Sequence, residues 1–347
     1  MLRRYCLVVG LCLFVLPLLL AAGCGGAGAA NTDTGDGASA TGVFTLRIGC
    51  QKSSLLLNLL RANGRLQERL GPSVKIVFKE FPAGPQLLEA LNVGGVDFGH
   101  AGETPPVFAQ AAGVPLVYSA CEEESPRSEA ILVPADSPIE RVADLRGKRV
   151  ALNKGSNVHH LLAKALEAAG VSYDEVQPVF LPPADARAAF ESKSVDAWVI
   201  WDPYYAAVER AGSCRVLIDG TGLVGNRGYY LATASLASEH AEVLQAIVEE
   251  LASTSHWVEE NQQASIEFLA ETLGMEVATI DLAERRRRYG VMPVDANIAA
   301  AQQEVADIMA RIGLIPRPIN VSEVVWTPLR MWEGSSHGNV LVPADTR

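Results

Sequence analysis

The sequence predicts an α/β fold in which parallel strands and helices form two lobes. From residue 43 onward, short β-rich segments alternate with longer segments of helical periodicity, and this alternation is typical of parallel sheets. After residue 235 the pattern becomes almost wholly helical. The body beyond residue 42 has about 305 residues, which is large for one hydrophobic core and comfortable for two. Together these features indicate a chain that crosses between two lobes and returns.

The first 23 residues have the layout of a secretory signal peptide. Two arginines precede an apolar run at 5–22, and small residues close the run before Cys24. A membrane-spanning helix is the alternative, but Gly10 and Pro17 interrupt the run. The stretch LLLAAGCGG at 18–26 resembles the bacterial lipobox, in which cleavage leaves a lipid-modified cysteine as the new first residue. We therefore expect an exported protein, lipidated at Cys24 and anchored in the periplasm or at the outer face of the cytoplasmic membrane.

Residues 24–42 are expected to form a flexible linker behind the lipidated cysteine. They are rich in Gly, Ala, Ser and Thr and contain nothing large to bury. A random coil of this length has a root-mean-square reach on the order of 20–25 Å. The lipid would hold the body at a membrane surface without spanning the membrane.

Charge and cysteine content exclude several functions for the body. The formal net charge is −11, which argues against binding to nucleic acid or anionic membranes but not against a small anionic ligand. Beyond the signal and Cys24, the cysteines are Cys50, Cys121 and Cys214, with no CxxC or Cys/His spacing. We expect no metal site and at most one disulfide.

Nine segments are predicted as strands and two long segments as C-terminal helices. The predicted strands are 45–49, 74–78, 96–99, 116–119, 130–133, 148–152, 179–181, 197–200 and 215–218. Helical patterns fill the gaps between them. The tail contains long helical runs at 242–261 and 297–313.

Five predicted strands are followed at once by a helix that starts with a capping residue, glycine or proline. These helix starts are Ser53 or Ser54, Gly84–Pro85, Thr104–Pro105, Gly155–Ser156 and Asp202–Pro203. Helix N-termini at the carboxyl ends of parallel strands direct free N–H groups and partial positive charge into the crevice where such sheets bind ligands. The series predicts a receptor for an anion.

The stretch NKGSNVHHLL at 153–162 could suggest a metal or catalytic site because of its two histidines. Helical geometry places His159 at the edge of the apolar face and His160 nearly opposite, toward water, so the pair cannot chelate one ion. The spacing fits neither a phosphate-binding loop nor a nucleophile elbow. An anion cradle of backbone N–H groups near Gly155 and Ser156, with His159 at its edge, is the remaining interpretation.

Other charged residues receive structural interpretations. The run Arg285–Arg288 is interpreted as a solvated helix end. Asp202 is interpreted as a helix cap, because no second carboxylate or nucleophile is placed beside it. Two roles stay open for Glu103, which could bind an amine of the ligand or only order a loop. Trp257, Trp326 and Trp332 are interpreted as packing residues.

Three blocks of the chain, at 78–113, 137–156 and 181–207, resemble the aliphatic sulfonate-binding proteins of ABC importers, relatives of the taurine- and nitrate-binding proteins. The resemblance implies the two-lobed class II periplasmic-binding fold, with a hinge and a ligand cleft. It also implies a monomeric receptor, without cofactor or enzymatic activity, that closes on an alkanesulfonate and presents it to an ABC permease in the cytoplasmic membrane. We expect lobe 1 to begin at 43–128, lobe 2 to span 129–225, and residues 226–347 to return to lobe 1 and form the helical tail.

The resemblance also implies a set of ligand-binding residues. These are Gln51, Lys52, Ala83, Gly84, Glu103, Thr104, Gly155, Ser156, His159, Trp201, Asp202 and Tyr204. The chain departs from the family pattern at Cys50, at Glu103 and at Asn157–Val158, so taurine, nitrate or another small oxyanion is an alternative ligand. An enzyme similar to the thiamine-pyrimidine synthases is a further alternative, against which the export signal and the lack of a cysteine- and histidine-rich segment argue.

Overall fold

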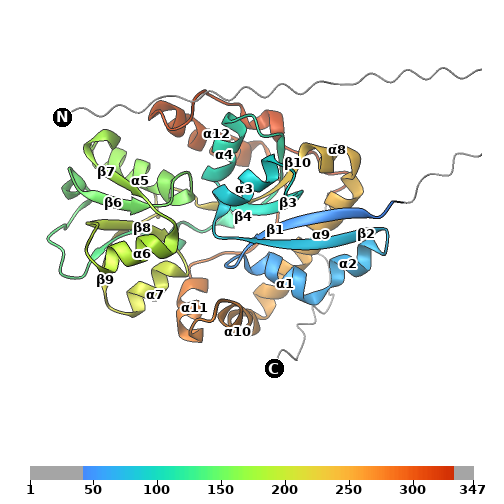
Figure 1. The fold of residues 1–347 in the computed structure, drawn as a ribbon, viewed down its shortest axis with the longest axis horizontal. Coiled ribbons are helices and arrows are strands. Elements are labelled where there is room, and N and C mark those ends of the chain that lie inside the picture. Colours follow the sequence, from blue (N-terminus) through green and yellow to red (C-terminus); the bar gives the residue numbers. More distant parts are fainter. Residues whose placement is uncertain (1–41, 332–347) are drawn as a thin grey trace, which may run out of the picture. The chain divides into compact units, whose positions relative to one another are not determined.

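The computed structural model describes residues 42–331, which form two five-stranded sheets with their helices (Figure 1). The predicted signal peptide, Cys24, the linker up to residue 41 and Trp332 lie outside the described residues. We call the sheet that begins the described chain, with its helices, lobe 1 and the other lobe 2.

The sheet of lobe 1 is mixed, with strand order β2-β1-β3-β10-β4. Its strands are β1 (Phe44–Gln51), β2 (Val74–Phe81), β3 (Phe98–Gly102), β4 (Leu116–Glu124) and β10 (Arg227–Thr233). β1 pairs in parallel with β2 and β3, whereas β10 runs antiparallel to β3 and β4. β10 was missed in the sequence, because its core residues Tyr229, Tyr230 and Leu231 are all buried and show no alternation of apolar and polar residues.

The sheet of lobe 2 has the same kind of mixed pairing, with strand order β7-β6-β8-β5-β9. Its strands are β5 (Glu129–Pro134), β6 (Arg149–Leu152), β7 (Gln177–Phe180), β8 (Ala197–Trp201) and β9 (Cys214–Asp219). β6 is parallel to β7 and β8, and β5 is antiparallel to β8 and β9. Each of the nine predicted strands overlaps an observed strand, and the expected parallel pairing is found in both sheets, each of which also contains antiparallel pairs.

The antiparallel strands are those that enter a sheet from the other lobe. β5 begins at Glu129 opposite Trp201, the last residue of β8. β10 likewise has Gly228 opposite Gly102, the last residue of β3. Both strands therefore start at the edge where the parallel strands end, and they must run the other way. The edge at which the parallel strands end therefore faces the segments that connect the two lobes.

Helices cover both faces of the two sheets. They are α1 (Leu55–Asn63), α2 (Arg65–Leu70), α3 (Gly84–Asn92), α4 (Thr104–Ala111), α5 (Asn157–Ala168), α6 (Pro183–Glu191), α7 (Tyr204–Arg210), α8 (Ala234–Glu239), α9 (Ala241–Glu260), α10 (Gln262–Leu273), α11 (Val277–Glu284) and α12 (Ala296–Arg311). The neighbouring residues Ile131 and Leu132 are both fully buried and belong to separate hydrophobic clusters, as expected for a strand covered on both faces. The C-terminal helices pack on lobe 1, and α11 also contacts α7 of lobe 2.

The chain crosses between the sheets in two segments, 125–128 and 220–226. The N–H of Ser125 donates to the carbonyl of Gly225 at 3.0 Å, and the N–H of Gly220 donates to the carbonyl of Pro126 at 3.1 Å. Asn226 has a positive φ of 47°, a conformation that asparagine tolerates better than most residues. The two crossings therefore form one hydrogen-bonded hinge.

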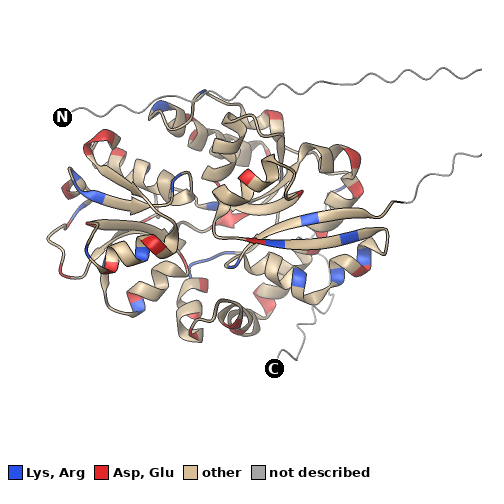
Figure 2. Ribbon diagram, in the orientation of Figure 1, with Lys and Arg blue, Asp and Glu red and all other residues tan. Residues whose placement is uncertain are grey.

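The three cysteines of the described residues are buried or half-buried. Cys50, Cys121 and Cys214 are all free, and burial raises the pKa of Cys121 to about 12 and that of Cys214 to about 11. Among residues 42–331 there is no cluster of His, Cys, Asp and Glu that could hold a metal ion, and no helix is long and apolar enough to cross a membrane. Figure 2 shows Lys and Arg spread over both lobes among Asp and Glu.

Candidate functional site

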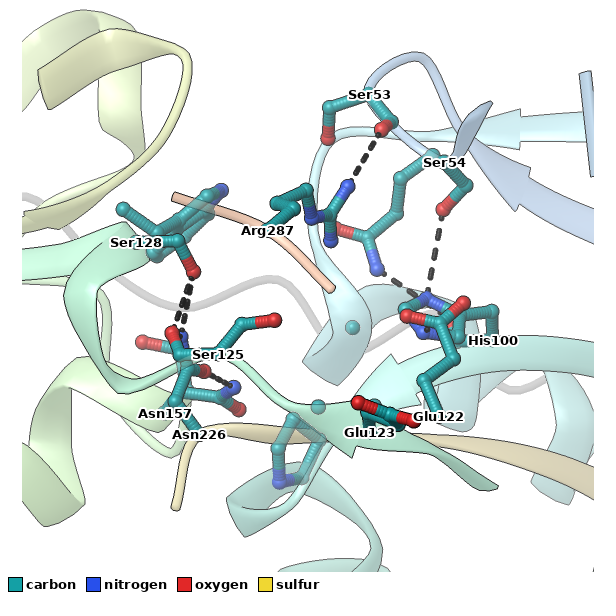
Figure 3. Close-up of a pocket in the computed structure, with 17 residues that line it drawn as sticks. Ser53, Ser54, His100, Glu122, Glu123, Ser125, Ser128, Asn157, Asn226 and Arg287 are labelled. Atoms are coloured by element: carbon teal, nitrogen blue, oxygen red, sulfur yellow. Dashed lines mark hydrogen bonds and ion pairs between the residues drawn. The ribbon is translucent and has the colours of Figure 1, made fainter. Parts of the chain in front are cut away.

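A cavity of about 70 Å³ lies where the two sheets face the hinge. Residues of both lobes and of both crossings line it, and Figure 3 shows them as sticks. They are Gln51, Ser53, Ser54, Gly84, His100, Gly102, Pro105, Glu122, Glu123, Ser125, Ser128, Ser156, Asn157, Trp201, Asn226, Gly228 and Arg287. The small volume and the largely polar side chains suit a compact polar ligand.

Four of the five predicted helix starts contribute to this cavity. Ser53 and Ser54 precede α1, Gly84 opens α3, Pro105 lies in the first turn of α4, and Ser156 caps α5. The first N–H groups of a helix have no acceptor within the helix. The cavity is therefore surrounded by helix N-termini from both lobes, whose partial positive charge favours an anion.

Gly84 and Ser156 show how the sequence permits this arrangement. A Cβ atom at Gly84 would lie 3.0 Å from both Ala101 Cβ and Pro105 Cγ, so α3 and α4 approach each other closely only with glycine there. The hydroxyl of Ser156 donates to the carbonyl of Asn153 at 2.7 Å. Its oxygen lone pairs stay available as acceptors, while the hydrogen bond holds the turn before α5 in place.

Glu122 is a buried carboxylate at the wall of the cavity. The Tyr230 hydroxyl donates to Glu122 Oε1 at 2.6 Å, and His100 Nε2 lies 3.5 Å from the same oxygen. Burial raises the pKa of Glu122, but His100, Arg287 and Tyr230 together outweigh it and lower the pKa to about 2. Glu122 is thus ionised at neutral pH.

Arg287 is the cationic side chain of the cavity, contrary to the interpretation of Arg285–Arg288 as a solvated helix end. α11 ends at Glu284 in a hydrogen-bonded turn, and Arg286 and Arg287 of the following segment are partly buried. Arg287 Nη1 donates to the carbonyl of Ser53 at 3.4 Å. Arg286 forms ion pairs with Asp202 and Glu209 of lobe 2. Arg285 and Arg288 are exposed, so the interpretation holds for those two alone.

The hinge supplies an amide network to the cavity. Asn157 Nδ2 donates to Asn226 Oδ1 at 2.5 Å, and Asn226 Nδ2 donates to the carbonyl of Ser125 at 3.0 Å and to Ser128 Oγ at 2.9 Å. α5 of lobe 2 is thereby joined to both crossing segments. A ligand bound here would touch the hinge itself.

The structure brings together only part of the site implied by the family resemblance. Gln51, Gly84, Ser156 and Trp201 line the cavity, and Gln51 Nε2 also donates to the carbonyl of His100 at 3.2 Å. The other residues lie outside the lining: Lys52, Ala83, Glu103, Thr104, Gly155, His159, Asp202 and Tyr204. Lys52 is exposed, whereas Ala83 and Thr104 are buried behind the helix starts, and Tyr204 packs edge-on against Trp201.

His159 does not line the cavity but holds the turn at Gly155, before α5, in place. The N–H of Gly155 donates to His159 Nδ1 at 3.1 Å, and His159 Nε2 lies 2.6 Å from the Tyr173 hydroxyl. Burial, with a smaller effect of Lys154, lowers the pKa of His159 to about 4, so the ring is neutral at pH 7. The N–H of Gly155 therefore already donates within the protein and is not free to bind the ligand.

The prediction that His160 faces water is wrong. His160 is 5% exposed, and its Nδ1 lies 2.5 Å from Glu103 Oε1 across the lobe boundary. The helical periodicity of α5 is as predicted, but its far side packs against α4 of lobe 1. Glu103 also accepts a hydrogen bond from the Arg227 N–H at 3.2 Å, so both of its carboxylate oxygens have partners within the protein.

Asp202 lies one residue before Pro203, the N-cap residue of α7, so the predicted cap position is off by one, although its side chain still accepts from the first turn of the helix and also bridges the lobes. Its Oδ1 accepts from the Ala206 N–H at 3.0 Å in the first turn of α7. Arg286 Nη1 lies 3.3 Å from both of its oxygens. Burial raises the pKa of Asp202 to about 7, and Arg286 opposes that rise.

Sequence reasoning missed His100, Glu122, Ser125, Ser128 and Asn226 as lining residues. His100 lies in β3 and Glu122 in β4, where they look like ordinary strand residues. Polar residues near the carboxyl ends of predicted strands, in FGHAG and CEEES, were a usable signal. Ser125, Ser128 and Asn226 lie in the hinge, which only the crossing of the chain reveals.

The comparisons with known proteins agree with this geometry. A model of the family described as NMT1/THI5 like matches residues 71–269. A protein of Escherichia coli K12 named as an aliphatic sulfonates-binding protein is 43% identical over 287 residues, which cover 82% of this chain and 90% of that protein. The chain belongs to the aliphatic sulfonate-binding proteins.

Solved structures of this family share the fold. The alkanesulfonate-binding protein SsuA from Xanthomonas axonopodis pv. citri, bound to MOPS, is 42% identical with a TM-score of 0.77 over 81% of this chain and 98% of that one. The periplasmic aliphatic sulphonate-binding protein SsuA from Escherichia coli is 43% identical with a TM-score of 0.75 over 82% and 97%. The predicted two-lobed periplasmic-binding fold of this sulfonate-binding family member is confirmed.

Proposed function

We propose that this chain is an extracytoplasmic receptor of an ABC importer that captures an aliphatic sulfonate between its lobes and delivers it to a membrane permease. The observation that carries the proposal is the cavity at the hinge, which four helix N-termini surround in a member of the sulfonate-binding family. No cofactor is needed for this role. Taurine, nitrate or another small oxyanion is the alternative ligand for the same receptor.

The site has the chemistry to bind a sulfonate tightly enough. A sulfonate stays ionised at biological pH, so fixed dipoles can bind it without proton exchange. A helix N-terminus contributes about 0.3–1 kcal/mol and a charge-assisted hydrogen bond about 1.5–3 kcal/mol. A micromolar Kd requires about 8 kcal/mol. A few such contacts with the serines, Asn157 and Arg287, together with apolar cover from Trp201, reach this value after the cost of ordering.

Binding fits the cavity better than catalysis does. The nearest approach to a nucleophilic arrangement is Ser54, His100 and Glu122. Ser54 Oγ is 3.5 Å from His100 Nδ1, and His100 Nε2 is 3.5 Å from Glu122, whereas a working nucleophile and base lie about 2.6–3.2 Å apart. Glu122 also already accepts a hydrogen bond from Tyr230. The relatives above are named as binding proteins.

Thermal unfolding with a ligand panel tests the proposal. The panel contains alkanesulfonates of increasing length, taurine, nitrate and bicarbonate. A ligand at 100 times its Kd stabilises the folded state by about 2.7 kcal/mol, which raises Tm by several degrees. We expect a shift with at least one sulfonate and none with bicarbonate. If every sulfonate leaves Tm unchanged, the assigned ligand class is wrong.

Substitutions test whether the cavity is the binding site. Ser156→Ala and Trp201→Ala are expected to weaken binding of the ligand by tenfold or more, about 1.4 kcal/mol each. Lys52→Ala is the matched control, because Lys52 is implied by the family resemblance but is exposed outside the cavity. Isothermal titration calorimetry measures all three. Equal affinity in all three variants would place the site elsewhere.

We further propose that Cys24 carries the lipid anchor and that the lobes divide at 128/129 and 225/226. The signal-like N-terminus supports the anchor, and the assignment of β1–β4 and β10 to one sheet and β5–β9 to the other supports the division. A Cys24→Ser variant should leave the membrane fraction and lose incorporation of labelled fatty acid. Retention in that fraction with undiminished labelling would refute lipidation at Cys24.

A further inference from the structure

Glu129 is a buried carboxyl group that the binding of a ligand in the cavity does not use. It is the first residue of β5, directly after the hinge segment 125–128, and its exposed fraction is 0%. Neither of its carboxyl oxygens has a hydrogen-bond partner among residues 42–331. Burying an ionised carboxylate without a partner costs far more than burying the neutral acid. With the lobes in this arrangement, Glu129 therefore holds a proton.

The side chain of Glu129 lies on the face of β5 that packs against α5. Side chains two residues apart in a strand share a face, and Ile131 belongs to one hydrophobic cluster with Val158 and Leu161 of α5. Burial and, to a smaller extent, the negative charge of Glu103 raise the pKa of Glu129 well above its usual range. No cation of the described residues opposes this rise.

The other carboxylates near the start of β5 have partners of their own. Asp202 follows the residue of β8 that pairs with Glu129, and Arg286 lies 3.3 Å from its Oδ1. Asp219 of β9 accepts from the Thr221 N–H at 2.9 Å. Glu129 is thus the carboxyl group at this end of the sheet whose state is set by burial and by Glu103.

Glu103 belongs to lobe 1 and Glu129 to lobe 2, so the charge that acts on Glu129 depends on the contact between the lobes. Across the same boundary, Glu103 Oε1 lies 2.5 Å from His160 Nδ1, and α4 packs against α5. When the lobes separate, Glu103 moves away and water reaches the side of α5 that α4 covered. A hydrated glutamate has a pKa of about 4.3 and is ionised at neutral pH.

We propose that closure of the lobes on a ligand binds one proton at Glu129, so that ligand capture is coupled to proton uptake. The open receptor carries a Glu129 carboxylate. It takes one proton from solvent as it closes, and the complex contains the carboxylic acid. The sulfonate exchanges no proton and stays an anion among the helix starts. This inference rests on the proposed receptor function and adds a control of that function by pH.

The coupling determines the sign of the pH dependence. Because the pKa of Glu129 is higher in the closed state than in the open one, closure is favoured most below the open-state pKa. The advantage is lost as pH rises through the closed-state pKa. Between the two values, ligand affinity falls by up to about tenfold per pH unit. The receptor therefore binds its ligand more tightly in an acidic medium.

Calorimetry with methanesulfonate, ethanesulfonate and 1-butanesulfonate tests the proposal, because none of these ligands titrates between pH 5 and pH 8. Succinate and imidazole buffers contain no sulfonate and differ in their enthalpy of ionisation. The difference between the heats of binding in the two buffers gives the number of protons exchanged. We expect wild-type protein to take up about one proton per ligand at the pH of maximal uptake, and Kd to rise with pH.

Glu129→Gln replaces the acid by a neutral group of the same size and should lower the uptake by about one proton. Its affinity should exceed that of wild type at pH 8. Glu124→Gln is the control, because Glu124 is exposed and paired with Arg227 at 3.2 Å. It should keep the wild-type uptake.

If wild-type protein binds a sulfonate without taking up a proton, the coupling is refuted while the receptor function stands. The same conclusion follows if Glu129→Gln keeps the full uptake, because another group such as His160 then binds the proton. If none of the three sulfonates binds at any pH, the receptor function itself is refuted. The wild-type measurement does not depend on how the variants fold.

Discussion

Glu122 shows how a single buried charge is kept at the wall of the cavity. The Tyr230 hydroxyl, His100 and Arg287 favour its ionised form more than burial opposes it, and its pKa falls to about 2. These partners come from β10, β3 and the segment after α11, so the carboxylate joins three parts of lobe 1. An ionised group held in this way links the stability of the fold to pH.

Glu122→Gln should lower the free energy of unfolding at pH 7 by a few kcal/mol. Because the folded-state pKa lies below the ordinary value of about 4.5, the stabilisation by wild-type Glu122 is fully present above that pH and is lost as pH falls toward 2. Urea unfolding of both proteins from pH 7 to pH 3 measures the difference. Glu124→Gln is the control and should change stability by less than about 1 kcal/mol. A difference that does not shrink with falling pH would contradict this explanation.

At the scale of elements, β3 of lobe 1 and α5 of lobe 2 approach each other more closely than side chains normally allow. A Cβ atom at Gly102, the last residue of β3, would lie 1.9 Å from Asn157 Oδ1 at the start of α5. Next to this contact, Glu103, the residue before α4, and His160 of α5 form a buried pair with 2.5 Å between Glu103 Oε1 and His160 Nδ1. Both contacts exist only while the lobes are together.

Gly102→Ala should weaken ligand binding by tenfold or more, because the added methyl group collides with Asn157 and keeps β3 and α5 apart. The melting temperature of the ligand-free protein should change little, since the collision is between lobes and not within one. Asn157→Ala provides the matched background. In the Asn157→Ala background, Gly102→Ala should cause little further loss of ligand affinity. Calorimetry of the two single variants and the double variant measures this difference. If Gly102→Ala weakens binding equally in wild-type protein and in Asn157→Ala, the added methyl group does not act through a collision with Asn157.

His160→Leu should also weaken binding by about tenfold, because it leaves Glu103 buried without its partner when the lobes meet. Removing one partner of a buried hydrogen-bonded pair leaves the other polar group unsatisfied, which is costly in the state that contains the pair. Arg311→Ala is the control: Arg311 pairs with Glu167 between α12 and α5, but both side chains are at least half exposed. An exposed pair contributes little. Similar losses in the two variants would argue against a special role for the buried pair.

At the scale of the whole molecule, the two lobes are held together on both sides of the hinge. Glu103 and His160 join α4 to α5, while Arg286 joins the segment after α11 to Asp202 at the start of α7. Arg286 also lies over the Tyr205 ring, 3.8 Å from its centroid. A receptor that releases its ligand has to break both sets of contacts.

Arg286→Met should therefore increase the rate of ligand release, as His160→Leu does, with little change in the association rate. Because the two pairs share no partner, their effects on the free energy of binding should add in the double variant to within about 0.5 kcal/mol. Stopped-flow measurement of association and dissociation rates tests this. Slower association with unchanged release would show that the pairs act before the lobes meet.

Much of the fold and part of the site followed from the sequence. Capping residues and prolines after short strands located helix starts to within a residue, and four of them line the cavity through Ser54, Gly84, Pro105 and Ser156. The nine strands were predictable for the same reason. The sequence patterns that mark a strand or a helix end lie within a few consecutive residues. Gly84 and Ser156 were therefore visible in the sequence as candidates for an anion site.

The tertiary structure alone decided how charges pair and which strands run antiparallel. Glu122 and Tyr230 are 108 residues apart, and His160 and Glu103 are 57 apart, so no local pattern connects them. Arg287 looked solvated because four arginines on a helix cover all of its sides, but the helix had already ended at Glu284. Local chemistry in the sequence determined the helix starts that can receive an anion. The return of the chain through the hinge decided which charged groups meet them, because burial and pairing depend on residues distant in sequence.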